Sequence, residues 1–141
     1  MEDPFDLRRF VEAQSVEYNS ILGELKAGSK QGHWMWYMFP QISGLGSSSM
    51  SQRFAISSLS EAQAYLEHST LGGRLQECTR IVLTANRSSA DEIFGRIDAL
   101  KFRSCMTLFS ECSKNSTIFR LALEHFFNGK ADARTLQILG A

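Results

Sequence analysis

Apolar side chains recur every three or four residues along most of this chain, which is the spacing of one face of an α-helix. No segment alternates apolar and polar residues over more than a few positions, and no Asn-Gly turn joins two β-rich runs. The pattern therefore predicts an all-α protein. Gly72 and Gly73 fall in the first turn of the clearest helix, where they weaken it and let another backbone approach. The apolar positions of that helix are Leu71, Leu75, Cys78, Val82 and Ala85.

Helix start and stop signals divide the chain into about seven or eight short helices. Ser58 with Glu61 and Ser89 with Glu92 have capping-box spacing, in which the two side chains satisfy the first N–H groups of a helix. The predicted helices are a first one that begins at Asp3-Pro4, then 16–27, 58–66, 71–85, 89–94, 99–112 capped by Asp98, one from Ser116 or Thr117 to the stop signal Asn128-Gly129, and a last one capped by Asp132.

The size and charge of the chain limit its class. A length of 141 residues without an internal repeat or low-complexity tract predicts one domain, residues 1–141. Fifteen basic residues balance fifteen acidic ones, so no general positive field favours a nucleic-acid partner or an anionic membrane. No apolar run is long enough to span a bilayer.

Three cysteines (Cys78, Cys105 and Cys112) are an odd number and form no C-x-x-C pair. The acidic N-terminus lacks the pattern of a signal peptide, so we expect reduced thiols in a cytoplasmic protein. The three histidines are widely separated and have no metal-ligand spacing. We therefore expect neither a metal nor another cofactor.

Residues 33–41 combine His33, both tryptophans, a tyrosine and a phenylalanine directly before a Gly/Ser loop. Trp34 and Trp36 are two residues apart, which places them about 200° apart around a helix. One indole is expected to pack inward while the other meets a cavity. His33 beside aromatic walls is a candidate base or hydrogen-bond donor, or a histidine that only bonds a backbone group at a helix start.

The loop Gly44-Leu45-Gly46-Ser47-Ser48-Ser49 precedes a predicted short helix at 50–55. Its N–H groups and hydroxyls could hold a phosphate or carboxylate, and Arg53 would supply a bidentate cation. The loop lacks the phosphate-binding pattern of a P-loop. The alternative is a flexible connector with a solvated arginine.

Lys101 and Ser104 lie on one edge of the apolar helix at 99–112. A lysine on such a helix must either pair with a carboxylate such as Asp98 or open onto a cavity under the tryptophans. A Ser/Lys nucleophile pair is a further reading, although no oxyanion hole can be identified. The charges of Arg8 and Arg9 are expected on a solvated helix face.

Several motifs together resemble the family known as domain of unknown function 1810. The resemblance covers nearly the whole chain in order, and its aromatic block is the most specific part. It implies a small all-helical domain and no established activity. The motifs include Pro4-Phe5-Asp6-Leu7, Arg9-Phe10-Val11, His33-Trp34-Met35-Trp36, Phe39-Pro40-Gln41, Gly44-Leu45-Gly46-Ser47, Glu61-Ala62 and Met106-Thr107-Leu108-Phe109.

Two functional hypotheses follow from these residues. The first is a pocket that binds a small planar anionic metabolite, such as a nucleotide or phosphorylated compound, by base stacking and charge-assisted contacts. The second is a non-catalytic helical adaptor whose aromatic block is only core; no protein partner is identified from the sequence. The residues expected to bind the ligand are His33, Trp34, Trp36, Gln41, Gly44, Gly46, Ser47, Arg53, Lys101 and Ser104.

Overall fold

The computed structural model describes residues 2–113 and 117–140, and helices account for most of this part of the chain. It contains nine helices and no strand; one isolated parallel bridge joins Ile42 to Ile56. The predicted all-α class is confirmed, with one or two more helices than expected. The helices are α1 (Arg8–Lys26), α2 (Met35–Met38), α3 (Ser49–Arg53), α4 (Leu59–Glu67), α5 (Leu71–Thr84), α6 (Ala90–Phe94), α7 (Arg96–Cys112), α8 (Ile118–Phe127) and α9 (Ala133–Leu139).

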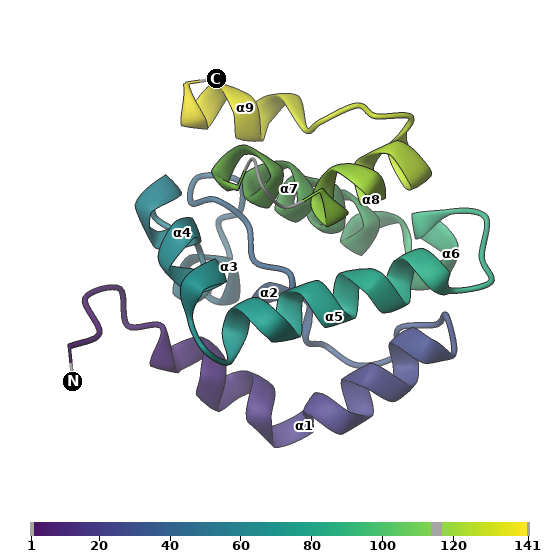
Figure 1. The fold of residues 1–141 in the computed structure, drawn as a ribbon, viewed down its shortest axis with the longest axis horizontal. Coiled ribbons are helices and arrows are strands. Elements are labelled where there is room, and N and C mark those ends of the chain that lie inside the picture. The colour runs from purple at the N-terminus through teal and green to yellow at the C-terminus, as the bar shows by residue number, and fades with distance from the viewer. Residues whose placement is uncertain (1, 114–116, 141) are drawn as a thin grey trace.

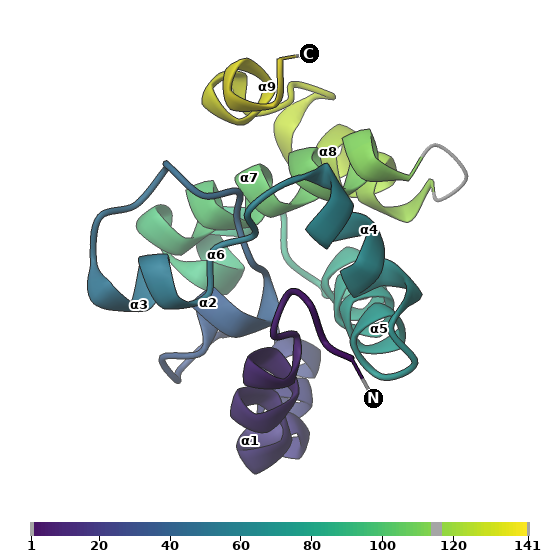
Figure 2. The ribbon, with the colours of Figure 1, turned by 90° about the vertical axis from the view of Figure 1, so that its left-hand side faces the viewer.

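The long helices α1, α5 and α7 organise the molecule. Helix α5 lies between α1 and the pair formed by α7 and α8, and α9 covers the side opposite α1 (Figure 1). Helices α2 and α3 lie on one side of the molecule, and α4 and α5 lie on the other (Figure 2). No helix among the described residues has both the length and the apolar character needed to cross a membrane.

Aromatic side chains of α7 and its neighbours form the centre of the core. Phe102 of α7 packs edge-on against Phe39 at 5.1 Å between ring centroids and stacks on Phe94 at 4.8 Å. None of the surface of Phe102 or Phe39 is exposed. Each buried phenylalanine stabilises the fold by about 1.5–3 kcal/mol relative to an exposed one. Most apolar residues of α7 are buried in this core, although Ile97 and Leu100 are exposed.

Several predicted helix ends are confirmed. Ser58, Ser89 and Asp132 each cap a helix by accepting a hydrogen bond from the N–H group three residues later. Asn128 adopts the left-handed conformation that ends α8. Of the two starts predicted for α8, Thr117 occupies the N-cap position without a side-chain capping bond, and Ser116 lies outside the described residues.

The two helices predicted before residue 28 are present as two helical segments of one element, α1 (Arg8–Lys26), which meet at a kink at Glu17 (φ −134°, ψ 22°). The kink lies next to residue 16, where the second helix was predicted to begin. The expected start at Asp3-Pro4 lies outside the helix. Asp3 instead accepts hydrogen bonds at its carboxylate from the N–H groups at the beginning of α1.

The predicted cap of α7 is also corrected. The helix begins at Arg96, one residue after Gly95, whose φ of +83° ends α6 and starts α7. Asp98 therefore lies in the first turn of α7, where a carboxylate interacts favourably with the helix dipole. It is free to bind side chains from another segment.

Gly72 confirms the predicted close approach of another backbone to α5. A Cβ atom at this position would lie 2.0 Å from the carbonyl oxygen of Leu66 in α4, which is far inside van der Waals contact. A Cβ atom at the adjacent Gly73 would meet no atom within 4 Å. The first glycine is thus required by the α4–α5 junction and the second is not.

Candidate functional site

Trp34 belongs to the core. None of its surface is exposed, and its indole N–H donates to Glu24 Oε1 at 2.9 Å. The same carboxylate oxygen accepts the backbone N–H groups of Gln31 at 2.6 Å and Gly32 at 2.9 Å. Burial alone would raise the pKa of Glu24, but these hydrogen bonds and the nearby charge of Lys30 lower it below its ordinary value. In this conformation Trp34 therefore presents no ring face to a ligand.

Asp98 lies between two lysines that each contact a tryptophan. Its Oδ2 is 2.8 Å from Lys30 Nζ and its Oδ1 is 3.1 Å from Lys101 Nζ. Lys30 Nζ is 5.2 Å from the centroid of the Trp34 ring, and Lys101 Nζ is 4.7 Å from that of Trp36. Burial would raise the pKa of Asp98, but the two lysines lower it. Lys101 is therefore paired with a carboxylate, the structural alternative stated above, although it does lie beside Trp36.

Ser104 takes part in docking α9 onto α7. Its hydroxyl oxygen lies 3.1 Å from the carbonyl oxygen of Leu100 and 3.2 Å from Asp132 Oδ2, so its proton can be donated to either. Asp132 also caps α9 by accepting the N–H of Thr135 at 3.0 Å. Neither of the two cavities described next is lined by Ser104. The structure does not bring Ser104 to the predicted pocket.

Four of the predicted residues meet around a very small cavity. Trp36, Gln41, Gly44 and Gly46 line a space of about 20 Å³, which holds roughly one water molecule. A Cβ atom at Gly46 would lie only 2.6 Å from Ser51 Oγ, so the loop packs tightly against α3. The predicted convergence of the glycine loop and an indole therefore exists, but without room for a metabolite.

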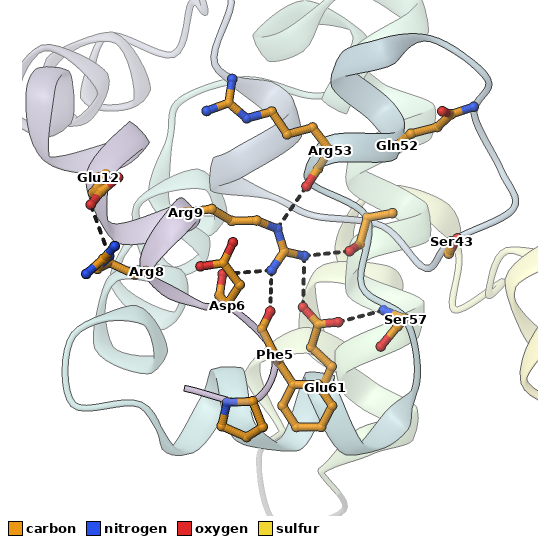
Figure 3. A pocket seen from close by; sticks show the side chains of 12 residues that line it. Phe5, Asp6, Arg8, Arg9, Glu12, Ser43, Gln52, Arg53, Ser57 and Glu61 are labelled. Atoms are coloured by element: carbon orange, nitrogen blue, oxygen red, sulfur yellow. Dashed lines mark hydrogen bonds and ion pairs between the residues drawn. The ribbon is translucent and has the colours of Figure 1, made fainter. Parts of the chain in front are cut away.

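The remaining predicted residues lie on the surface. His33, Ser47 and Arg53 are exposed. Arg53 alone of the ten lines a larger cleft, of about 760 Å³. The cleft lies between the N-terminal segment with the first turns of α1 on one side and the end of α3 with the segment after it on the other (Figure 3). This cleft is the candidate functional site.

Arg9 joins the two walls of the cleft. The prediction that it lies on a solvated helix face is wrong. Only 16% of its side chain is exposed, and 3% of that of its partner Glu61. All five N–H groups of its guanidinium are used, in the arrangement that Figure 3 shows. They donate to the carbonyl oxygens of Phe5, Asp6, Arg53 and Ala55 at 2.6 to 2.8 Å and to Glu61 Oε2 at 2.9 Å.

Arg53 and Asp6 differ from the other charged groups of the cleft, because neither forms an ion pair within the described residues. The Arg53 guanidinium lies 5.1 Å from the centroid of the Phe54 ring and extends away from Arg9 (Figure 3). Asp6 has a φ of +51°, a left-handed conformation that aspartate tolerates better than most residues. Its exposed carboxylate is on the opposite wall.

Sequence reasoning did not identify Arg9, Glu61 or Asp6 as members of a site. Glu61 was predicted only as part of a capping box with Ser58, but its Oε1 accepts the N–H of Ser57 at 2.9 Å and its Oε2 binds Arg9. A signal was present, because all three residues belong to motifs of the family resemblance. Helical periodicity alone places Arg9 on a polar face and cannot show that a distant segment covers it.

No group of three or more His, Cys, Asp or Glu side chains in residues 2–113 and 117–140 is arranged to hold a metal ion. The family model described as "Protein of unknown function (DUF1810)" matches residues 4–139. The crystal structure of the conserved hypothetical protein Rv1873 from Mycobacterium tuberculosis is similar, with 50% sequence identity and a TM-score of 0.96. The match covers 99% of each chain. Comparison with curated proteins gave no match.

Proposed function

Because the chain belongs to the DUF1810 family, whose description names no activity, we propose from the cleft itself that the protein binds a small anionic ligand, such as a phosphorylated metabolite, beside Arg53. One observation carries the proposal: an exposed guanidinium without a carboxylate partner among the described residues lines a cavity of about 760 Å³. That volume is within the usual range of ligand pockets, roughly 300–1,000 Å³.

The chemistry of the lining supports an anion. A guanidinium binds phosphate or carboxylate through two parallel N–H bonds, which gives both orientation and charge-assisted strength. Ser43, Gln52 and Ser57 line the same cleft and carry neutral polar side chains that can add hydrogen bonds. The ligand would thus meet one cation that has no ion-pair partner among the described residues, together with several polar groups.

The cleft walls are fixed before a ligand arrives. Arg9 joins the N-terminal turn to the segment after α3 through hydrogen bonds to both. Its donors are saturated, so Arg9 positions the walls and is not expected to bind the ligand itself. Because these segments are already ordered, ligand binding does not have to offset the conformational entropy lost in ordering them.

The aromatic residue proposed to contact the ligand is Phe5, in place of the two tryptophans expected from the sequence. Trp34 is fully buried, and Lys101 lies over the half-buried ring of Trp36. Phe5 is half-buried at one end of the cleft (Figure 3). A planar group of the ligand would pack against this ring.

Thermal unfolding with and without ligand tests the proposal. Adenosine monophosphate, ribose 5-phosphate and inorganic phosphate are added at millimolar concentration, and the dissociation constant of any compound that raises the Tm is measured by calorimetry. We expect at least one organic phosphate to raise the Tm, because a ligand stabilises the state that binds it. Arg53→Gln should weaken that binding by about tenfold or more.

Arg120→Gln is the matched control, because Arg120 is an exposed arginine on α8, which does not line the cleft. It should leave the dissociation constant unchanged. The proposal fails if none of the three compounds raises the Tm, or if Arg53→Gln binds as the parent protein does.

A protein-interaction module is the second candidate, favoured by two exposed apolar residues of α7. Ile97 is 72% exposed and Leu100 is 59% exposed, one turn apart on the same helix. A stoichiometric partner that is lost on Leu100→Ser but retained by Arg53→Gln would support this function. A partner that both variants retain equally would show that this face is not used.

A further inference from the structure

We infer that the ligand of the cleft is zwitterionic, with an anionic group at Arg53 and an amino group at Asp6. The inference rests on the proposed function and adds a positively charged group to the proposed ligand. It follows from which charges of the cleft are already paired, from the backbone that holds Asp6, and from the position of its carboxylate.

The charges of the cleft are balanced but not all paired. Its lining contains three arginines and three carboxylates. Two ion pairs use two groups of each sign, and Arg53 and Asp6 remain. The pairs are Arg9 with Glu61 at 2.9 Å and Arg8 with Glu12 at 3.2 Å.

The backbone of Asp6 is held on both sides. Its carbonyl oxygen accepts a hydrogen bond from Arg9 at 2.8 Å, and its N–H donates to the carbonyl oxygen of Asp3 at 3.0 Å. The position of the side chain is therefore set by a fixed turn, even though the carboxylate itself is exposed. No hydrogen bond or ion pair found among the described residues involves this carboxylate, and none is drawn to it in Figure 3.

This arrangement discriminates between anions. A ligand with only negative charge would gain the contact with Arg53 but would place like charge in the same cavity as Asp6. A ligand that also carries an ammonium group would convert that repulsion into attraction. Asp6 thus disfavours simple anions and favours zwitterions, while Arg53 supplies the shared anion contact.

The test compares aminoalkyl phosphates with alkyl phosphates of equal length. Phosphoethanolamine is paired with ethyl phosphate, and 3-aminopropyl phosphate with propyl phosphate, and each dissociation constant is measured near neutral pH. For at least one length we expect the amino compound to bind about fivefold more tightly, the effect of one additional exposed ion pair.

Asp6→Asn is the diagnostic variant, because asparagine also tolerates the left-handed backbone and the variant should keep the Tm of the parent protein. It should abolish the preference for the amino compound without weakening the alkyl phosphates. Gln52→Glu would add a second carboxylate without an ion-pair partner to the cleft and should increase the preference.

The outcomes separate this inference from the proposed function. Equal binding of amino and alkyl compounds, or a preference that survives Asp6→Asn, overturns the zwitterion inference. If Arg53→Gln still weakens binding by about tenfold or more, the proposed function stands. Failure of all four compounds to bind overturns the inference, and failure of the nucleotide and sugar phosphates as well overturns the proposed function.

Discussion

Arg9 and Arg53 carry the same side chain, and their surroundings give them different roles. Arg9 is enclosed by two segments, and all five N–H groups of its guanidinium donate to carbonyl oxygens or to Glu61. Arg53 is exposed, and its guanidinium lies over the ring of Phe54. The first residue therefore contributes stability, whereas the second is the residue proposed to bind the ligand.

Arg9→Ala should lower the free energy of unfolding by about 3 kcal/mol. The substitution leaves the buried carboxylate of Glu61 without its cation and removes the guanidinium donors from four carbonyl oxygens. Urea unfolding monitored by circular dichroism measures the change. Arg8→Ala is the control, because its ion pair with Glu12 is exposed and should contribute well under about 1 kcal/mol. Equal effects of the two substitutions would contradict this role of Arg9.

The carboxylates of Glu24 and Asp98 should make the fold sensitive to acid. Hydrogen bonds and neighbouring lysines lower the pKa of both groups below their ordinary values of 4.5 and 3.8. A carboxylate whose pKa is lower in the folded state stabilises the fold above its unfolded pKa, and that stability is lost as pH falls through the folded pKa. We therefore expect the free energy of unfolding to decrease as pH falls below about 4.5.

Glu24→Gln tests the source of this acid sensitivity. The variant cannot titrate at this position, so its free energy of unfolding should fall less steeply over the acid range than that of the parent protein. Chemical unfolding at a series of pH values measures both curves. Parallel curves would show that Glu24 does not contribute to the dependence on pH.

At the scale of helices, the sequence correctly predicted those helix ends that are set by side chains within a few residues. The serine and aspartate caps act within three residues, and the structure contains them as predicted. The kink at Glu17 lies next to the predicted boundary at residue 16. The error at Asp98 has a different cause, because this residue lies in the first turn of α7 and binds Lys30. Helical periodicity cannot show a partner that distant in the sequence.

The two glycines of α5 provide a matched pair of substitutions. Gly72→Ala should destabilise the protein by about 2 kcal/mol or more, because the new methyl group overlaps the carbonyl oxygen of Leu66. Gly73→Ala should stabilise it by about 0.5–1 kcal/mol, because the site is open and alanine favours the helix. Thermal unfolding of both variants measures the difference. A Gly72→Ala protein as stable as Gly73→Ala would mean that α4 and α5 are not in such close contact.

At the scale of the whole molecule, the fold class followed from periodicity, but the position of the cleft did not. The cleft forms where the N-terminal segment meets the residues after α3, two segments joined by Arg9. The aromatic block drew attention because it is unusual in composition, yet its rings mostly fill the core, as Trp34 and Phe39 do. Composition identifies large side chains, and only the packing shows which of them face a cavity.

Chemical-shift mapping by NMR would locate the bound ligand on the protein. Amide and indole N–H signals are followed by NMR during titration with phosphoethanolamine. The largest shifts should occur at Asp6, Arg53 and Ser57, while the indole signals of Trp34 and Trp36 stay fixed. Shifts at the two indoles with none at Arg53, or no shifts anywhere, would contradict the account.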